Sequence, residues 1–265
     1  MTTHEIDDRA IARYNVPALE KGMAILELLA SSPVPLNLTA ISAQLGRSTG
    51  EIYRILQYLD HCDYIVRSRD GDTYSLSMKM FHLSHEHPPL RALTSVAVPV
   101  MEELAARSGQ SCHLGVLSRI NVTIVTTISS PLPLCYSVRL GAQFPVWETS
   151  SGILLCAFLA EPARRNLFAA LSQIIDDQAL SDLRHKMTQV SEAGFEERGS
   201  LRIPGIVNMS FPVRDRLGTV VAALTVPYLP QRAAPAAPDE VKAMVARAAA
   251  SLSAGLGYRD GDSSY

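Results

Sequence analysis

The chain has 265 residues, of which 47% are hydrophobic and 19% are charged, and it contains 15 glycines and 16 prolines. This is the composition of an ordinary folded protein, and at roughly 100 to 200 residues per domain the length predicts two domains. The net charge of -2 argues against a wholly basic nucleic-acid binder, because nonspecific affinity comes from neutralised phosphates, so any contact with nucleic acid must be local.

An amphipathic helix is predicted first, over residues 18–31. Pro33 and Pro35 end it, and Asn37 then serves as the predicted N-cap of a short helix that ends at Gly46. The apolar positions of the first helix recur every three or four residues, so we expect them to face the core: Leu19, Met23, Ile25, Leu26, Leu29 and Ala30.

A second helix follows after a three-residue turn and is predicted to begin at about Ser48. Ser48 and Glu51 have the spacing of a capping box, in which the serine hydroxyl accepts from the N3 amide and the glutamate reaches back to the cap amide. The 3.6-residue period separates a buried stripe from an opposite polar side. The stripe contains Ile52, Ile55, Leu56 and Leu59, and the polar side carries Thr49, Gly50, Tyr53, Arg54 and Gln57.

A short hairpin with basic residues completes the first domain, which we place at residues 16–78. Residues 64–67 and 73–76 are β-prone and flank a Ser-Arg-Asp-Gly-Asp turn. This order of elements is that of a winged helix-turn-helix, whose second helix enters the major groove of DNA. The predicted DNA-binding residues are Arg47, Ser48, Thr49, Tyr53, Arg54, Gln57, Arg67 and Arg69.

Two other interpretations stay open at this point. Winged helices also dock proteins, so a protein-interaction adaptor without sequence-specific DNA binding is the alternative. Arg54 alone could be a solvated side chain, or could pair with Glu51 or Asp60.

Residues 79–93 are expected to form a linker that is interrupted at Pro88 and Pro89. His82, His85 and His87 lie in it with the spacing HxxHxH, which could ligate zinc or copper. No thiol or carboxylate cluster completes the set in sequence. A polar linker explains the histidines as well, and we predict no metal site.

The second domain is predicted to span residues 94–258. Strand pairs and helices that need not alternate indicate an α+β domain on a largely antiparallel sheet. The expected helices are residues 94–108, about 151–171 and 176–190, and the expected strands are residues 111–117, 121–128, 206–213 and 219–226.

Together these segments resemble the IclR family of bacterial transcription regulators. "LEKGMAILELLA" resembles its opening helix and "LTAISAQLGRSTGEIYRILQYLDHCDYIVRSRDGDTYSL" its helix-turn-helix and wing. "LGAQFPVWETSSGILLCAFL" and "PGIVNMSFPVRDRLGTVVAALTV" resemble parts of its effector domain, so the resemblance implies a GAF-like effector-binding fold. The chain departs from the family at Gly152-Ile153, where Gly-Lys is usual, and at Cys62-Asp63, where a glycine precedes the wing strand.

A ligand site is predicted where a helix opens near Ser150, Ser151 and Gly152. Free backbone amides and the positive helix end favour a carboxylate or another anion there, and small residues allow close approach. Trp147 could wall an apolar pocket or simply pack in the core. The resemblance adds Asn208 and Thr225 as ligand-facing positions. His113 could also point inward from its strand, but a core histidine with its hydrogen bonds satisfied is the more frequent case, and we expect that one.

Several classes of function are disfavoured. The four cysteines are widely spaced in apolar contexts, which predicts buried thiols and no disulfide framework. We find no nucleotide-binding loop or hydrolase motif, so we predict no catalytic residues, no cofactor and no enzyme. No apolar run approaches the ~20 residues of a membrane span, and the acidic N-terminus is unlike a signal peptide, so we expect a cytoplasmic protein without membrane contact.

The resulting hypothesis is a transcription regulator that responds to a ligand. It would bind double-stranded DNA at a pseudo-palindromic operator as a homodimer or homotetramer. Its small-molecule effector would be an organic acid, with an aromatic acid as one candidate.

Overall fold

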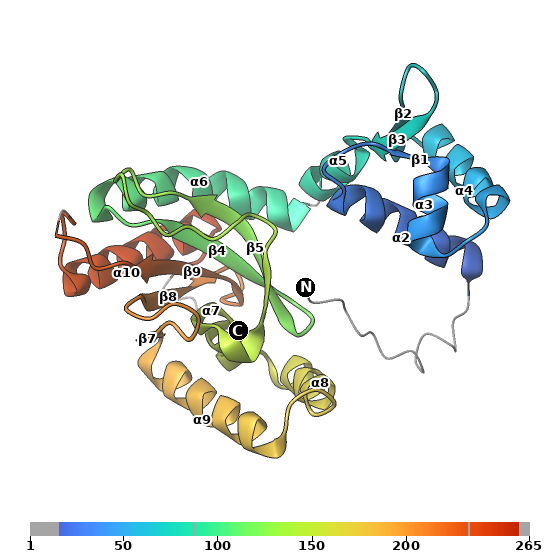
Figure 1. Cartoon of the computed structure of the whole chain (residues 1–265). Helices are drawn as coiled ribbons and strands as arrows, with labels where there is room; N and C mark the ends of the chain where they lie inside the picture. Colours follow the sequence, from blue (N-terminus) through green and yellow to red (C-terminus); the bar gives the residue numbers. More distant parts are fainter. Residues whose placement is uncertain (1–15, 87, 233, 260–265) are drawn as a thin grey trace. The chain divides into compact units, whose positions relative to one another are not determined.

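The computed structural model describes residues 16–86, 88–232 and 234–259 of the chain (Figure 1). The described residues form two compact units that divide between residues 87 and 88. The first unit is a small helical domain with a short sheet, and the second is built on a larger sheet covered by helices.

The first unit has the predicted winged helix-turn-helix order. Helix α2 (Pro17–Ser31) is followed by strand β1 (Leu36–Asn37), helix α3 (Leu38–Leu45), helix α4 (Thr49–His61) and strands β2 (Ile65–Arg67) and β3 (Thr73–Leu76). The strands form an antiparallel sheet in the order β1-β3-β2. All three helices and the sheet contribute to one core, which contains Ile25, Leu26, Leu29, Ile41, Ile52, Leu56, Leu59, Ile65 and Tyr74.

The buried side of α2 differs from the prediction. Leu19, Met23 and Ala30 are exposed, and the buried stripe is formed by Gly22 with Ile25, Leu26 and Leu29. Gly22 explains this rotation, because α4 packs where the glycine has no side chain and Ile55 lies 3.8 Å from the position that a Cβ would take. The helix therefore shows Leu19 and Met23 to the surface.

The predicted caps of α3 are confirmed, but the predicted capping box at the start of α4 is not. The Asn37 side chain accepts a hydrogen bond from the Ala40 amide at 2.8 Å, and Gly46 adopts the left-handed conformation that ends α3, as predicted. The capping box is wrong. Ser48 occupies the N-cap position but makes no capping hydrogen bond, and Glu51 binds the Lys21 ammonium group of α2. An ammonium partner offers a stronger, charge-assisted bond than a backbone amide.

The expected linker is helical. Helix α5 (Lys79–Glu86) follows the wing, and helix α6 (Pro88–Ser108) begins at Pro88 rather than at residue 94. Pro88 and Pro89 occupy the first turn of α6, where a helix tolerates proline because those amides have no partner in the helix. In the HxxHxH motif, His82 lies on α5, but the side chain of His85 and the whole of His87 lie outside the described residues.

The second unit contains a six-stranded antiparallel sheet in the order β6-β5-β4-β9-β8-β7 among its described residues. The strands are β4 (Cys112–Ser118), β5 (Asn121–Ile128), β6 (Gln143–Pro145), β7 (Glu196–Gly199), β8 (Val207–Arg214) and β9 (Val220–Tyr228). This confirms the predicted α+β class.

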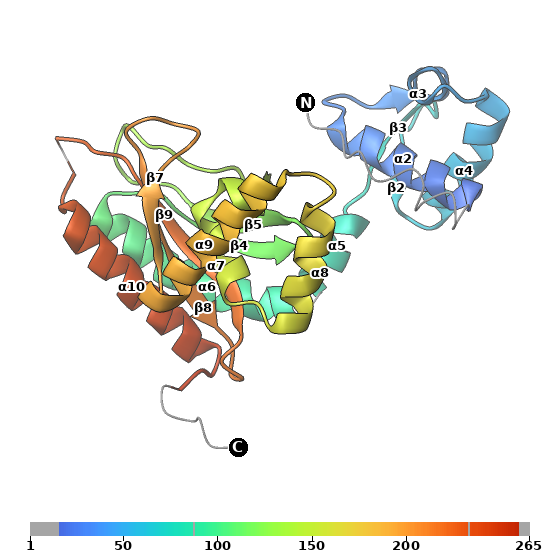
Figure 2. The same ribbon diagram turned by 90° about the horizontal axis from the view of Figure 1, so that it is seen from below.

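Helices cover both faces of this sheet (Figure 2). Helix α6 and helix α10 (Pro238–Gly255) pack on one face over a core that includes Leu114 and Leu224. On the other face, the short helix η2 (Val146–Glu148) leads into α7 (Ser150–Ala157), which packs with α8 (Glu161–Leu171) and α9 (Asp177–Ala193) over a second core. The single helix expected at 151–171 is two helices, since the chain leaves helical geometry after Ala157 and restarts with Pro162 in the first turn of α8.

Candidate functional site

The exposed side of α4 forms the first candidate site, and we call Thr49, Gly50, Tyr53, Arg54 and Gln57 the recognition face. All five residues are exposed. The opposite side of the same helix is fixed in the core, where Ile52 and Leu56 are 0% exposed. The helix is therefore anchored by its apolar side, and the recognition face is free for a partner.

Two of these side chains are already paired with each other. The Gln57 amide donates to the Tyr53 hydroxyl at 2.8 Å, one helical turn away. No other described residue holds the Arg54 guanidinium by a hydrogen bond or an ion pair. The alternative in which Glu51 pairs with Arg54 is not observed, because Glu51 is bound by Lys21.

The ion pair of Glu51 makes this acidic residue compatible with an anionic partner. The hydrogen bond from Lys21 holds the pKa of the Glu51 carboxyl below its usual value, and the charges of Lys21, Arg47 and Arg54 act in the same direction against the desolvation of the carboxylate. The Glu51 charge is thus neutralised from within the domain, and Arg47 and Arg54 are left to act outward.

The turn before α4 carries the next two predicted residues. Arg47 and Ser48 are both exposed. A guanidinium nitrogen of Arg47 lies 3.8 Å from a Glu20 carboxylate oxygen, and both side chains are largely solvated. Exposed pairs of this kind contribute about 0 to 1 kcal/mol, so Arg47 can exchange Glu20 for a phosphate at little cost.

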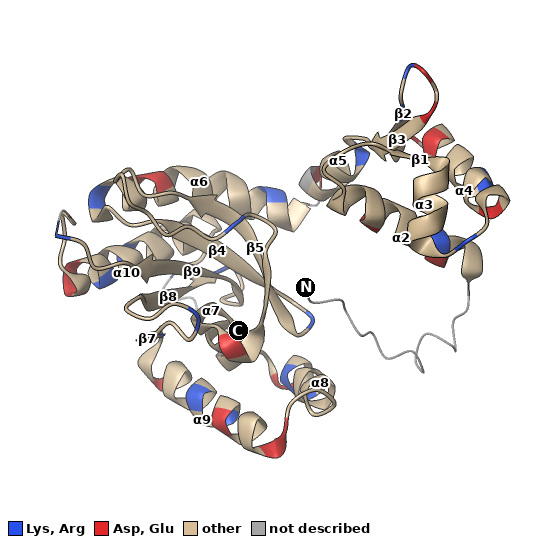
Figure 3. Cartoon of the chain, viewed as in Figure 1, with Lys and Arg blue, Asp and Glu red and all other residues tan. Residues whose placement is uncertain are grey.

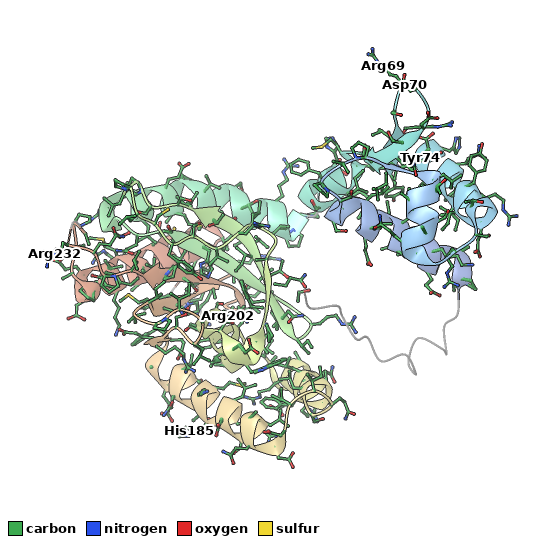
Figure 4. The ribbon with its side chains drawn as sticks, viewed as in Figure 1. Arg69, Asp70, Tyr74, His185, Arg202 and Arg232 are labelled. Atoms are coloured by element: carbon green, nitrogen blue, oxygen red, sulfur yellow. The ribbon has the colours of Figure 1, made fainter. Side chains whose placement is uncertain are left out.

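The two arginines of the wing, the β2–β3 hairpin, differ in whether the hairpin itself holds their side chains. Arg67 is held within the hairpin, since its Nε donates to the Gly71 carbonyl at 2.5 Å and its guanidinium lies 5.8 Å from the centre of the Tyr74 ring. Arg69 is exposed at the tip, next to Asp70 (Figure 4). The tip carries both basic and acidic residues (Figure 3). Arg69 is therefore the wing residue that is free to reach a partner.

The second candidate site is a small cavity, of about 50 Å³, between the sheet of the second unit and the start of α7. Four predicted residues come together there, namely Ser150, Ser151, Asn208 and Thr225. The other described residues that line it are His113, Ile124, Tyr136, Val138, Phe144, Glu148, Thr149, Ser200, Leu201 and Arg202.

Trp147 and Gly152 are not among the described residues that line this cavity. Trp147 packs instead against the core under α7, which is the second of the two alternatives for it. Gly152 has a packing role, because a Cβ at this position would lie 2.3 Å from the Val146 carbonyl oxygen. The Thr149 hydroxyl accepts from the Gly152 amide at 3.1 Å and caps the helix. Gly152 thus allows the sharp entry into α7 that positions Ser150 and Ser151.

His113 differs from the satisfied core histidine that we expected. Its side chain is buried at 7% exposure, and its Nδ1 has no hydrogen-bond partner among the described residues. Burial lowers the pKa of the imidazole to about 4. The strand alternation of β4 turns Cys112 and Leu114 toward α6 and α10, so His113 faces the cavity. This is the inward orientation that the sequence left open as the alternative for His113.

His113 is the first of several polar side chains that lie side by side on neighbouring strands of the sheet. Thr225 pairs with His113 in the register of β4 and β9, and the Thr225 and Ser210 hydroxyls are 2.8 Å apart. Asn208 lies two residues before Ser210 on β8 and therefore on the same face. His113, Thr225 and Asn208 form the polar floor of the cavity, and Ser210 supports it by its contact with Thr225.

The rim of the cavity holds residues that the sequence did not suggest. A guanidinium nitrogen of Arg202 lies 2.6 Å from a carboxylate oxygen of Glu148, and the guanidinium lies 5.1 Å from the centre of the Phe144 ring. Figure 4 shows Arg202 in the second unit. Nothing in the local pattern around Arg202 or Tyr136 signals a site, because distant loops bring them there.

The cysteines are only partly as predicted. Cys112 and Cys156 are buried, and burial raises the pKa of each thiol to about 12. Cys135 is exposed and Cys62 is half-buried, which corrects the expectation of four buried thiols. Within the described ranges, no three His, Cys, Asp or Glu side chains come together in a metal-binding group. No helix in those ranges is long and apolar enough to cross a membrane.

Two family models match the chain. Residues 18–69 match the IclR helix-turn-helix domain, and residues 90–254 match the bacterial transcriptional regulator IclR C-terminal domain. The two matches correspond to the unit that carries the recognition face and to the unit that contains the cavity.

Relatives and solved structures agree with these matches. The HTH-type transcriptional regulator KdgR of Escherichia coli K12 is 27% identical over 258 residues, which are 93% of this chain and 95% of the relative. The glycerol operon regulatory protein of Streptomyces griseus is 27% identical over 257 residues, 92% and 97% of the two chains. Both relatives match over nearly their whole length.

Two solved structures show the same fold. An IclR homolog from Microbacterium hydrocarbonoxydans, complexed with 4-hydroxybenzoate, has a TM-score of 0.74 at 21% identity, over 90% of this chain and 98% of that one. The IclR of Thermotoga maritima has a TM-score of 0.69 at 18% identity, over 92% and 100%. Because the C-terminal family model alone matches more than half of its residues, the chain belongs to the IclR family of bacterial transcription regulators.

Proposed function

We propose that the protein is a ligand-responsive regulator that binds a pseudo-palindromic operator as a homodimer or homotetramer. The observation that carries this proposal is the recognition face, whose polar side chains are exposed while the opposite side of α4 is fully buried. A helix held in this way can enter the major groove, with two copies reading two half-sites.

The proposed DNA contacts have different tasks. Arg54, Gln57, Tyr53 and Thr49 face the base edges and the nearby backbone. Arginine and glutamine are the side chains that best match the donor and acceptor pattern of guanine and adenine in that groove. Arg47, Ser48 and Arg69 bind phosphates and so position the helix without reading sequence. Arg67 supports the wing.

Exposed apolar side chains support association of two copies. Leu19 and Met23 on α2 are 62% and 45% exposed, and Met80 and Leu83 on α5 are 42% and 47% exposed. Apolar surface of this kind, in a domain that must present two helices to two half-sites, fits burial against a second copy.

The proposed effector is a small organic acid bound in the cavity beneath α7. Ser150, Ser151, Asn208 and Thr225 offer polar contacts, and Ile124 and Phe144 offer apolar walls that fit an aromatic ring. The 4-hydroxybenzoate complex of the Microbacterium homolog is a precedent for such a ligand in this fold. The effector changes operator affinity to the extent that it binds the DNA-competent and incompetent arrangements differently.

DNA binding is tested by measuring the affinity of a labelled operator fragment, selected from random DNA, at several salt concentrations. Wild type should give a steep slope of log affinity against log salt. Arg54→Ala should weaken binding by about 1 to 3 kcal/mol and relax specificity at one position in each half-site. Arg165→Ala, an exposed arginine of α8, is the control and should leave the affinity unchanged.

Unchanged affinity in Arg54→Ala would remove this residue from the contacts. Undetectable binding of the wild type at low salt would favour the protein-docking adaptor instead.

Effector binding is tested by calorimetry with 4-hydroxybenzoate and benzoate. Ser151→Trp should abolish binding because it fills the cavity, and Asn208→Leu should weaken it because it removes a polar contact. Thermal unfolding checks that both variants remain folded. Identical binding by wild type and folded Ser151→Trp would place the effector elsewhere.

A further inference from the structure

The cavity beneath α7 contains two buried polar atoms without a hydrogen-bond partner among the described residues. They are Nδ1 of His113 and Oγ of Ser150, and their residues are 7% and 2% exposed. Leaving such an atom unpaired costs about 1 to 3 kcal/mol, so both atoms favour a molecule that supplies the missing partners. Both residues line the same cavity, and Ser150 is the first residue of helix α7.

We propose that His113 is the charge partner of the effector, neutral in the empty cavity and protonated, with a proton taken from solvent, once a carboxylate binds. This inference rests on the effector site proposed above and adds the reason why that site selects anions. Ser150 contributes a hydroxyl donor, and the free amides at the start of α7 contribute further donors to the same carboxylate.

The pKa of His113 determines how the affinity for a carboxylate should change with pH. Burial lowers the pKa of the imidazole to about 4, so it is neutral near pH 7 while the cavity is empty. A carboxylate brought close to it favours the charged form and raises that pKa. The complex therefore holds one more proton than its separate components, and affinity for a carboxylate increases about tenfold for each unit by which the pH falls between the two pKa values.

The other charged groups around the cavity already have partners. Glu148 and Arg202 at the rim pair with each other. Glu196, on β7 in the same row of the sheet as Ser210, pairs with Arg198. The remaining titratable lining residue is Tyr136, which presents a phenol hydroxyl.

Within the described part of the second unit, no carboxylate is therefore left unpaired at the cavity to act as the counter-ion of His113. A ligand carboxylate can take that place.

The experiment measures proton uptake by the full-length protein. Benzoate, 4-hydroxybenzoate and propionate are titrated calorimetrically at pH 5.5 to 8, in buffers that differ in ionisation enthalpy, so that the protons taken up are counted. For the acid that binds, uptake should approach one proton at pH 5.5, and the Kd should increase as the pH rises. Benzamide, which has the shape of benzoate without its charge, should bind at least about tenfold more weakly and without proton uptake.

Variants separate His113 from the other groups. His113→Gln should lose the proton uptake and the pH dependence of the Kd, whereas Ser150→Ala should bind more weakly but keep both. His185→Gln, at an exposed histidine of α9 (Figure 4), should retain the uptake of the wild type.

Two results would overturn the proposal on its own. One is binding of an acid to wild type without proton uptake, which would mean that neutral His113 only forms a hydrogen bond. The other is uptake that persists in His113→Gln. If none of the three acids binds the wild type, the effector site falls together with this inference.

Discussion

The recognition face and the cavity beneath α7 both present unpaired polar groups, but in opposite surroundings. The Arg54 guanidinium is exposed, so water satisfies it at no cost, and its lack of a partner carries information only through its place on a helix-turn-helix. His113 and Ser150 are buried, where a missing partner is costly. The proposed DNA-binding face is therefore identified by its position on a helix-turn-helix, whereas the proposed ligand cavity is identified by the free-energy cost of its unpaired buried groups.

Glycine 152 gives the largest expected effect and tests the buried side of this comparison. Gly152→Ala brings a Cβ to 2.3 Å from a backbone oxygen, so the start of α7 must shift. We expect the free energy of unfolding of the second unit to fall by about 3 kcal/mol, and effector binding to weaken with it. Differential scanning calorimetry measures the change. An unchanged transition would show that the entry into α7 is not tightly packed.

The stability of the second unit at low pH tests the neutral burial of His113. Burial lowers the pKa of His113 in the folded protein to about 4, from its ordinary value of 6.5, so the unfolded chain binds the proton more tightly. The contribution of neutral, buried His113 to the free energy of unfolding is therefore complete above pH 6.5. It is lost as the pH falls toward 4, by about 3 kcal/mol in total. Urea unfolding across this range should show the loss in wild type, and His113→Gln should lack this part of it. Parallel curves for the two proteins would contradict the burial of a neutral imidazole.

Arg69 tests the exposed side with a smaller effect. As a phosphate contact at the wing tip, it should contribute one unit of charge but no sequence information. We expect Arg69→Ala to weaken binding to all sequences about equally and to reduce the salt slope by about 1. Arg165→Ala again serves as the control. A change in sequence preference instead of in slope would indicate that the wing reads bases.

Gly50 gives the smallest expected effect and is the exposed counterpart of Gly152. No atom lies within 4 Å of the position that a Cβ at Gly50 would take, and the residue is helical. Gly50→Ala should therefore stabilise the first unit by about 0.5 to 1 kcal/mol, because alanine loses less backbone freedom on folding. Thermal unfolding detects this as a small rise in Tm. A lower Tm would mean that the space around Gly50 is not open.

The sequence predicted the first unit better than the second because its signals are local. The Asn37 cap and Gly46 predicted the two ends of α3. Helix periodicity predicted α4 and its recognition face. The capping box failed because Lys21, distant in sequence, competes for Glu51. The exposed side of α2 was also missed, since only the packing of Gly22 against Ile55 decides which side is buried.

In the second unit the main strands were predicted, but several elements were not. The alternation of β4 and β5 is visible in the sequence, and β8 and β9 flank a recognisable turn at residues 214–218. The edge strands β6 and β7 are short. The break near residue 160 was missed although Pro162 marks it, because a helix tolerates proline only in its first turn. Helix α10 (Pro238–Gly255) was not predicted from the sequence.

Only part of the lining of the cavity was predicted, because some lining residues carry a local sequence signal and others do not. Ser150 and Ser151 belong to a recognisable helix start, whereas Arg202 arrives from a distant loop. Placing His113 in the cavity required knowing which face of the sheet each residue of β4 occupies.

The central claim is that the recognition face reads duplex DNA, and it is tested most directly by selecting the fragments that the full-length protein binds from random DNA at moderate salt. The account predicts one recurring two-fold symmetric sequence with half-sites about one helical turn, or a multiple of it, apart. It also predicts that enrichment is lost in Arg54→Ala and kept in Arg165→Ala. Recovery of no common sequence by the wild type, even at low salt, would contradict the claim.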